Sequence, residues 1–133
     1  MADTLLEPYL FFGGQCREAL DFYTSALGAK VEFIMTYREG PQPAPPGFED
    51  QIMHASLRLG DQRIMASDSC EDGVSFQGFA LSLKLPTEAD ARHVFDALAD
   101  RGTVRMPLGR TFWSPCFGMV TDRYGVGWMI TLA

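Results

Sequence analysis

The sequence predicts an α+β fold of two paired βαβββ modules, whose strands form a curved mixed sheet around a concave cavity with the helices on the outer side. The order strand, helix, strand, strand, strand occurs twice along the chain, with an offset of roughly 70 residues. Each predicted helix has one apolar face and a glycine after it. We therefore expect residues 1–133 to form a single domain, with half-modules at approximately 5–68 and 77–133.

The first half combines one amphipathic helix with four strands. Residues 9–12 are apolar and are followed by two glycines, which predicts a short strand. Apolar residues spaced by three and four across residues 15–27 predict a helix with one buried face, and Gly28 is typical of a left-handed helix end. Three further strands are predicted at residues 30–38, 52–59 and 63–67.

The second half repeats this order, beginning with a predicted strand at residues 79–83. Thr87 and Asp90 form a capping-box pattern that predicts a helix start, and Gly102 predicts its end. Two sheets could face each other or join into one curved sheet, and either arrangement leaves a concave face lined by alternate side chains. The remaining strands are predicted at residues 103–108, 117–121 and 126–132.

Composition excludes several classes of function. The net charge of −6 and the scattered positions of the eleven basic residues argue against nucleic acid as a partner. No apolar run reaches the roughly 18 residues of a membrane helix. The three cysteines form no CxxC pair and no secretory signal precedes them, so we expect reduced thiols in a cytoplasmic protein.

Several segments resemble one known superfamily. Residues 16–23 (CREALDFY), followed by Leu27 and Gly28, resemble the first helix of the vicinal-oxygen-chelate superfamily, which includes glyoxalase I, bleomycin- and fosfomycin-resistance proteins and extradiol dioxygenases. A narrower branch, the PhnB-like proteins, is similar over nearly the whole chain. The segments that carry this second resemblance are residues 53–55 (MHA), 65–68 (MASD), 106–108 (MPL), 111–114 (TFWS) and 117–130 (FGMVTDRYGVGWMI).

The resemblance implies a test for a metal site. Metal-dependent relatives place one His, Glu or Gln on each of four strands, and these positions correspond here to Pro8, His54, Phe79 and Met129. Only His54 offers a metal donor, so we expect no tightly bound metal and no glyoxalase I activity of the usual form, with weak divalent binding at His54 left open. The resemblance also implies a homodimer, since relatives of this length commonly complete their cavities across two chains.

His54 is the candidate catalytic residue. Its imidazole could act as a general base or hydrogen-bond to a ligand, or it could be a buried histidine with both nitrogens satisfied by neighbours. Asp68 could stand near it as a carboxylate or cap a turn, and Trp113 could cover a pocket or only pack. The candidate ligand-binding residues are Phe12, Tyr37, His54, Asp68, Phe79, Trp113 and Met129.

The function expected from these observations is the binding of a small, partly aromatic or apolar molecule, without a resident cofactor. The alternative is a lyase- or isomerase-type enzyme that uses His54 for proton transfer, and a further one is a dimeric interaction protein without a ligand. PhnB-like relatives often carry the description of a ubiquinone-pathway methyltransferase, which is the lower alternative. The doubled glycine at 13–14 is far weaker than a GxGxxG motif, and no doubly wound pattern is present.

Overall fold

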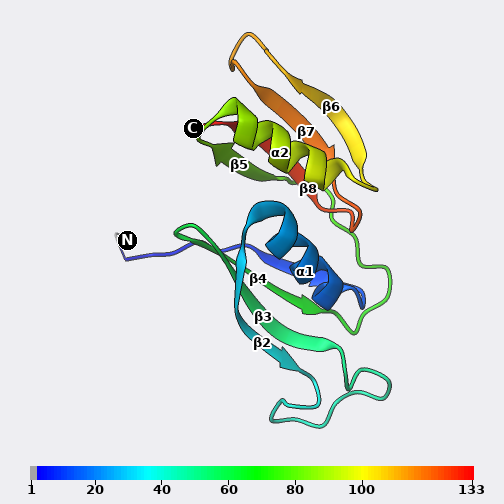
Figure 1. Ribbon diagram of the computed structural model, residues 1–133. Coiled ribbons are helices and arrows are strands. Elements are labelled where there is room, and N and C mark those ends of the chain that lie inside the picture. The colour runs from blue at the N-terminus through cyan, green and yellow to red at the C-terminus, as the bar shows by residue number, and fades with distance from the viewer. Residues whose placement is uncertain (1–2) are drawn as a thin grey trace. The chain divides into compact units, whose positions relative to one another are not determined.

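The computed structural model describes residues 3–133, and the chain divides into two compact units, Met1–Val74 and Ser75–Ala133. Each unit contains one helix and four strands in the order β, α, β, β, β (Figure 1). The predicted half-modules, 5–68 and 77–133, fall within these units. That the two units together make one domain stays a prediction.

The first unit is a four-stranded mixed sheet with one helix against it (Figure 1). The sheet order is β1-β4-β3-β2, in which β1 pairs with β4 in parallel and the other neighbours are antiparallel. Its elements are β1 (Tyr9–Phe12), α1 (Cys16–Leu27), β2 (Lys30–Thr36), β3 (Ile52–Leu59) and β4 (Gln62–Asp68).

Helix α1 covers one face of this sheet. Gly28 ends the helix as predicted, with φ of 71° and its N–H donated to the carbonyl of Thr24 at 3.2 Å. Strand residues on the helix side are fully buried and form the core with the apolar face of α1, as expected for strict alternation along a strand. They are Leu10, Phe12, Ala55, Leu57 and Ala66, facing Ala19, Leu20 and Tyr23 of the helix.

The second unit repeats this plan with the sheet order β5-β8-β7-β6. Strands β5 and β8 are parallel, and the other neighbours are antiparallel. Its elements are β5 (Leu81–Leu85), α2 (Glu88–Ala99), β6 (Thr103–Gly109), β7 (Phe117–Thr121) and β8 (Gly127–Leu132).

Helix α2 begins as predicted but ends differently. The hydroxyl of Thr87 accepts the backbone N–H of Asp90 at 3.1 Å, which confirms the cap. The left-handed residue after the helix is Arg101, with φ of 61°, and not Gly102. Gly102 is required for space instead, because a Cβ there would collide with the backbone carbonyl of Thr121.

The α+β class and the paired βαβββ modules are thus confirmed, and the strands of residues 3–133 form two separate four-stranded mixed sheets. Within the same residues, neither helix has the length and hydropathy needed to cross a membrane.

Candidate functional site

The sheet of the first unit has one face that α1 does not cover, and His54 lies on it. Alternation along β3 puts Ala55 and Leu57 in the core beneath the helix and turns His54 and Ser56 to the other side. Register places Met35 of β2 beside His54. We call this surface the His54 face; its residues are Tyr9, Phe11, Phe33, Met35, His54, Ser56 and Met65.

The imidazole of His54 is half-buried and held by Tyr9. The Tyr9 hydroxyl lies 2.9 Å from Nδ1 of His54, and the two rings have centroids 5.6 Å apart. Phe33 approaches the imidazole from β2 at 5.8 Å, and Phe11 stacks on Tyr9 at 4.8 Å. His54 therefore stands in an aromatic frame with one nitrogen bound and its ring orientation fixed.

This arrangement leaves Nε2 as the nitrogen available for chemistry. Within residues 3–133, the bond to Tyr9 is the one hydrogen bond found for the imidazole. If the Tyr9 hydroxyl donates to Nδ1, Nε2 carries the proton and can donate to a ligand. If Nδ1–H donates to the Tyr9 oxygen, Nε2 holds a lone pair and can accept a proton.

Ser56 adds a second polar group to the same face. It lies two residues from His54 on β3, between Phe33 of β2 and Met65 of β4. The side chain is 8% exposed, and its Oγ has no hydrogen-bond partner within the described residues. A buried hydroxyl without a partner is unusual, because the lost hydrogen bond to water is normally replaced.

Phe12, a predicted ligand-binding residue, lies in β1. The structure buries it to 1% exposure on the helix side of the sheet, opposite His54, so it belongs to the core of the first unit. The neighbouring residues Tyr9 and Phe11 occupy the His54 face in its place. All four residues of β1 are aromatic or apolar, so the sequence does not show which of them face the helix. The pairing of β1 with β4 shows it.

The carboxylate of Asp68 is hydrogen-bonded to the backbone. Oδ1 accepts the N–H groups of Gly14 and Cys16 at 2.8 and 2.9 Å, and Oδ2 accepts that of Ile52 at 2.9 Å. These bonds tie the entry to α1 and the start of β3 to the end of β4. Of its two predicted alternatives, capping agrees with this geometry.

Tyr37 follows β2 and points its hydroxyl into the same backbone region. The hydroxyl donates to the carbonyl of Asp68 at 2.7 Å, which uses its single proton. Burial raises the pKa of Tyr37 to about 12, with Cys70 as a further cause. Tyr37 therefore stabilises the end of β4.

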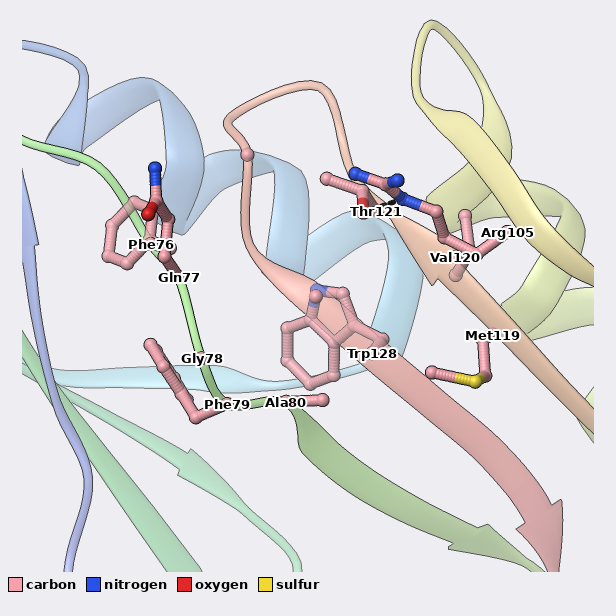
Figure 2. Close-up of a pocket in the computed structure, with 12 residues that line it drawn as sticks. Phe76, Gln77, Gly78, Phe79, Ala80, Arg105, Met119, Val120, Thr121 and Trp128 are labelled. Atoms are coloured by element: carbon pink, nitrogen blue, oxygen red, sulfur yellow. Dashed lines mark hydrogen bonds between the residues drawn. The ribbon is translucent and has the colours of Figure 1, made fainter.

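The other three predicted ligand-binding residues belong to the second unit. Phe79 is 50% exposed and lines a pocket of about 430 Å³ (Figure 2). Met129 lies in β8 beside Met119 of β7, on the sheet face that α2 does not cover. Trp113 is 55% exposed, packs edge-on against Phe112 and Phe117, and lines a shallow depression with residues 110–115.

Tyr9 is the residue that the sequence reasoning missed. One signal was available in the sequence. Tyr9 directly follows Pro8, and Pro8 corresponds to a metal-ligand position in the proteins that this chain resembles. Because the contact joins β1 to β3 across 45 residues of sequence, only strand pairing reveals it.

The donor set does not fit the metal that the superfamily implies. Of the four implied positions, Pro8, Phe79 and Met129 hold no suitable donor. In the part of the chain that the structure describes, no three His, Cys, Asp or Glu side chains gather in a metal-binding group. We therefore derive no step through a metal, and its absence stays a prediction.

Cys16 is buried and Cys70 is exposed, and this difference gives a direct test of the packing of the first unit. Burial, followed by the charge of Asp68, raises the pKa of Cys16 to about 12, whereas Cys70 is exposed. At pH 8 the thiolate fraction of Cys16 is then on the order of one in ten thousand. We expect iodoacetamide to alkylate Cys70 rapidly and to leave Cys16 intact, as read by peptide mass spectrometry. Equal rates at the two thiols would contradict this packing.

Comparison with known proteins places the chain in a family. The family model described as 3-demethylubiquinone-9 3-methyltransferase matches residues 5–131. The curated Escherichia coli (strain K12) protein YjdN is 36% identical over 138 residues, covering 96% of this chain and 94% of YjdN.

Solved structures agree. Protein PA1353 from Pseudomonas aeruginosa is 41% identical, with a TM-score of 0.91 and 98% of each chain covered. A PhnB protein from Bacillus cereus is 34% identical, with a TM-score of 0.84, covering 98% of this chain and 100% of that one. The fosfomycin resistance protein FosX from Listeria monocytogenes shares the fold at 8% identity and a TM-score of 0.72, with 100% of this chain and 95% of that one covered. This chain therefore belongs to the family described as 3-demethylubiquinone-9 3-methyltransferase, which confirms the PhnB-like resemblance.

Proposed function

We propose that this protein binds a small, partly aromatic molecule on the His54 face, with Nε2 of His54 as its main polar contact and without a tightly bound metal. The observation that carries the proposal is the imidazole fixed by Tyr9 inside a frame of half-exposed aromatic rings. Apolar surroundings with a few well-placed polar groups are typical of small-molecule sites.

Burial and exposure on this face support the proposal. Phe11 and Phe33 are 53% and 44% exposed, although large aromatic side chains gain free energy by leaving water. The Oγ of Ser56 is buried between Phe33 and Met65 without a partner among the described residues, so a ligand reaches it only when one of these side chains moves. A planar ligand that stacks on the phenyl rings of Phe11 and Phe33 and presents a hydrogen-bond acceptor to Nε2 of His54 would cover this exposed aromatic surface.

The test uses the two histidines of the chain as a matched pair. His54→Ala removes the proposed contact, while His93→Ala removes an exposed imidazole on α2. In a thermal-shift screen of small aromatic molecules with hydrogen-bond acceptors, we expect ligands that stabilise the wild type and His93→Ala alike. The same ligands should bind His54→Ala about tenfold more weakly than they bind the wild type. At saturating ligand this lowers the stabilisation of the variant by about 1.4 kcal/mol.

Two results would overturn the proposal. One is a set of ligands whose stabilisation is the same in His54→Ala as in the wild type. The other, which concerns the metal, is stoichiometric divalent metal in protein purified without chelator, retained in His93→Ala and lost in His54→Ala.

A second candidate function is metal-free proton transfer, and the Tyr9–His54 hydrogen bond favours it. A phenol bound to Nδ1 fixes the imidazole for a base or acid role at Nε2. Asp68, the carboxylate that the sequence suggested near His54, and Tyr37 are both hydrogen-bonded to the backbone. With the same variant pair, an identified ligand that exchanges a carbon-bound proton for deuterium only when His54 is present would establish this function.

The methyl-transfer reaction in the family description gains no support from this topology. Methyltransferase sheets of the doubly wound type alternate parallel strands with helices to form a nucleotide crevice. Each sheet described here has one parallel pair beside antiparallel neighbours. Homodimer formation, from the resemblance, and a cytoplasmic location, from the cysteine pattern, remain proposals.

A further inference from the structure

The second unit contains a pocket that the His54 proposal does not use. It has a volume of about 430 Å³ and lies where the segment before β5 passes the turn from β7 to β8. In Figure 2 the side chains of Phe76 and Phe79 lie on one side of Trp128, and those of Arg105 and Thr121 lie on the other. The pocket therefore combines an aromatic half with a cationic one.

The aromatic half is preformed. Phe76 and Phe79 meet edge-on with ring centroids 6.5 Å apart, and Phe79 is 50% exposed. Trp128 is buried to 1% exposure, and its Nε1–H donates to Asp122 at 2.9 Å, so its ring is held in place. Fixed rings lose little conformational freedom when a planar molecule packs between them.

The cationic half is Arg105, which is positioned but not neutralised. Its Nε–H donates to the hydroxyl of Thr121 at 3.1 Å, across the β6–β7 pair. The ion pairs found within residues 3–133 all involve other arginines: Arg38, Arg58, Arg63 and Arg123. The terminal nitrogens of Arg105 are thus left to donate to a ligand.

No lining residue of this pocket carries a negative charge. The nearest carboxylate in sequence, Asp122, is buried to 3% exposure and fully engaged. Its Oδ1 accepts the N–H groups of Tyr124 and Val126, and its Oδ2 accepts that of Trp128. In a chain with a net charge of −6, a cation without a local acid is suited to an anionic ligand.

We infer that this pocket is a binding site for a small aromatic carboxylate, with the carboxylate on Arg105 and the ring against Phe76 and Phe79. A carboxylate matches the two parallel N–H groups of one guanidinium. A phosphate would leave several oxygens without donors, because the lining offers one basic side chain. The inference concerns the second unit and does not depend on the role of His54.

The test measures 2-naphthoate and its neutral analogue 2-naphthalenemethanol by isothermal titration calorimetry. Arg105→Met keeps an apolar stem but removes the charge, and because Arg105 is exposed, the variant should fold. Arg110→Met makes the same change in net charge beside the other aromatic depression, at Trp113, and serves as the control. We expect 2-naphthoate to bind Arg105→Met at least about tenfold more weakly than it binds the wild type or Arg110→Met.

The neutral analogue separates charge from packing. It should bind the wild type more weakly than 2-naphthoate does, and Arg105→Met should leave its affinity unchanged. Amide chemical shifts give the location: on adding 2-naphthoate, Gly78, Gly125 and Gly127 of the pocket should move, while Gly60 in the β3–β4 hairpin should not.

Three results would overturn the inference: no saturable binding of 2-naphthoate by the wild type, equal affinity in Arg105→Met, or equal losses in Arg105→Met and Arg110→Met. A fourth would be shifts confined to residues outside the pocket. If no ligand bound the His54 face, each of these outcomes would be unchanged. Failure of the proposed function can therefore be distinguished from failure of the Arg105 inference.

Discussion

Asp68→Ala is expected to lower the free energy of unfolding by about 3–5 kcal/mol, the largest effect among the substitutions considered. The carboxylate is 2% exposed and accepts three backbone N–H groups, those of Gly14, Cys16 and Ile52. Alanine leaves the N–H groups of Cys16 and Ile52 buried and without partners, and each such donor costs roughly 1–3 kcal/mol. Urea denaturation followed by circular dichroism measures the change.

Two further variants test this explanation. Asp68→Asn keeps one acceptor oxygen and should lose less stability than Asp68→Ala. Asp50→Ala removes a carboxylate that is 89% exposed in an ion pair with Arg38, and should change the stability by less than about 1 kcal/mol. An Asp68→Ala protein as stable as Asp50→Ala would show that the three backbone bonds contribute little.

Gly102→Ala is expected to cost about 2–3 kcal/mol, for a steric reason. A Cβ at this position would overlap the carbonyl of Thr121, and would lie 2.9 Å from the carbonyl oxygen of Leu98 and 3.1 Å from Cα of Asp122. These are backbone atoms of β7, α2 and the turn after β7, so none can turn aside as a flexible side chain would. The midpoint of urea denaturation should therefore fall, with little change in the slope.

Gly109→Ala is the matched control for this effect. Gly109 closes β6 in the same unit, has no positive φ, and has no heavy atom within 4 Å of an added Cβ. Its substitution should change stability by no more than about 0.5 kcal/mol. Equal stability of Gly102→Ala and Gly109→Ala would mean that α2 and β7 can separate at no cost.

Much of the fold could be predicted from the sequence, because it depends on local patterns. The spacing of apolar residues in 15–27 predicts α1, and the observed helix differs by one residue at its start. The Thr87–Asp90 cap is a contact between residues three apart, so the sequence contains all of it. The end of α2 was less readable, because Arg101 adopts φ of 61° where Gly102 is needed for packing against β7.

The candidate site could be predicted from the sequence only in part. His54 could be placed on the uncovered face, since Ala55 and Leu57 identify the core face of β3 by alternation. Its partner Tyr9 could not, because the hydrogen bond depends on the register of β1 against β4 and of β4 against β3. The same register puts Phe12 in the core.

Spacing within single elements was enough to predict the repeated βαβββ order, the buried faces of both helices and the one imidazole on β3. Only the folded chain shows which side chains surround that imidazole and which carboxylates accept backbone hydrogen bonds. It also brings Arg105 to Thr121 beside three aromatic rings. The physical reason is that a side chain's partners across a sheet depend on strand pairing and register, and shifting a strand by one residue would exchange its two faces.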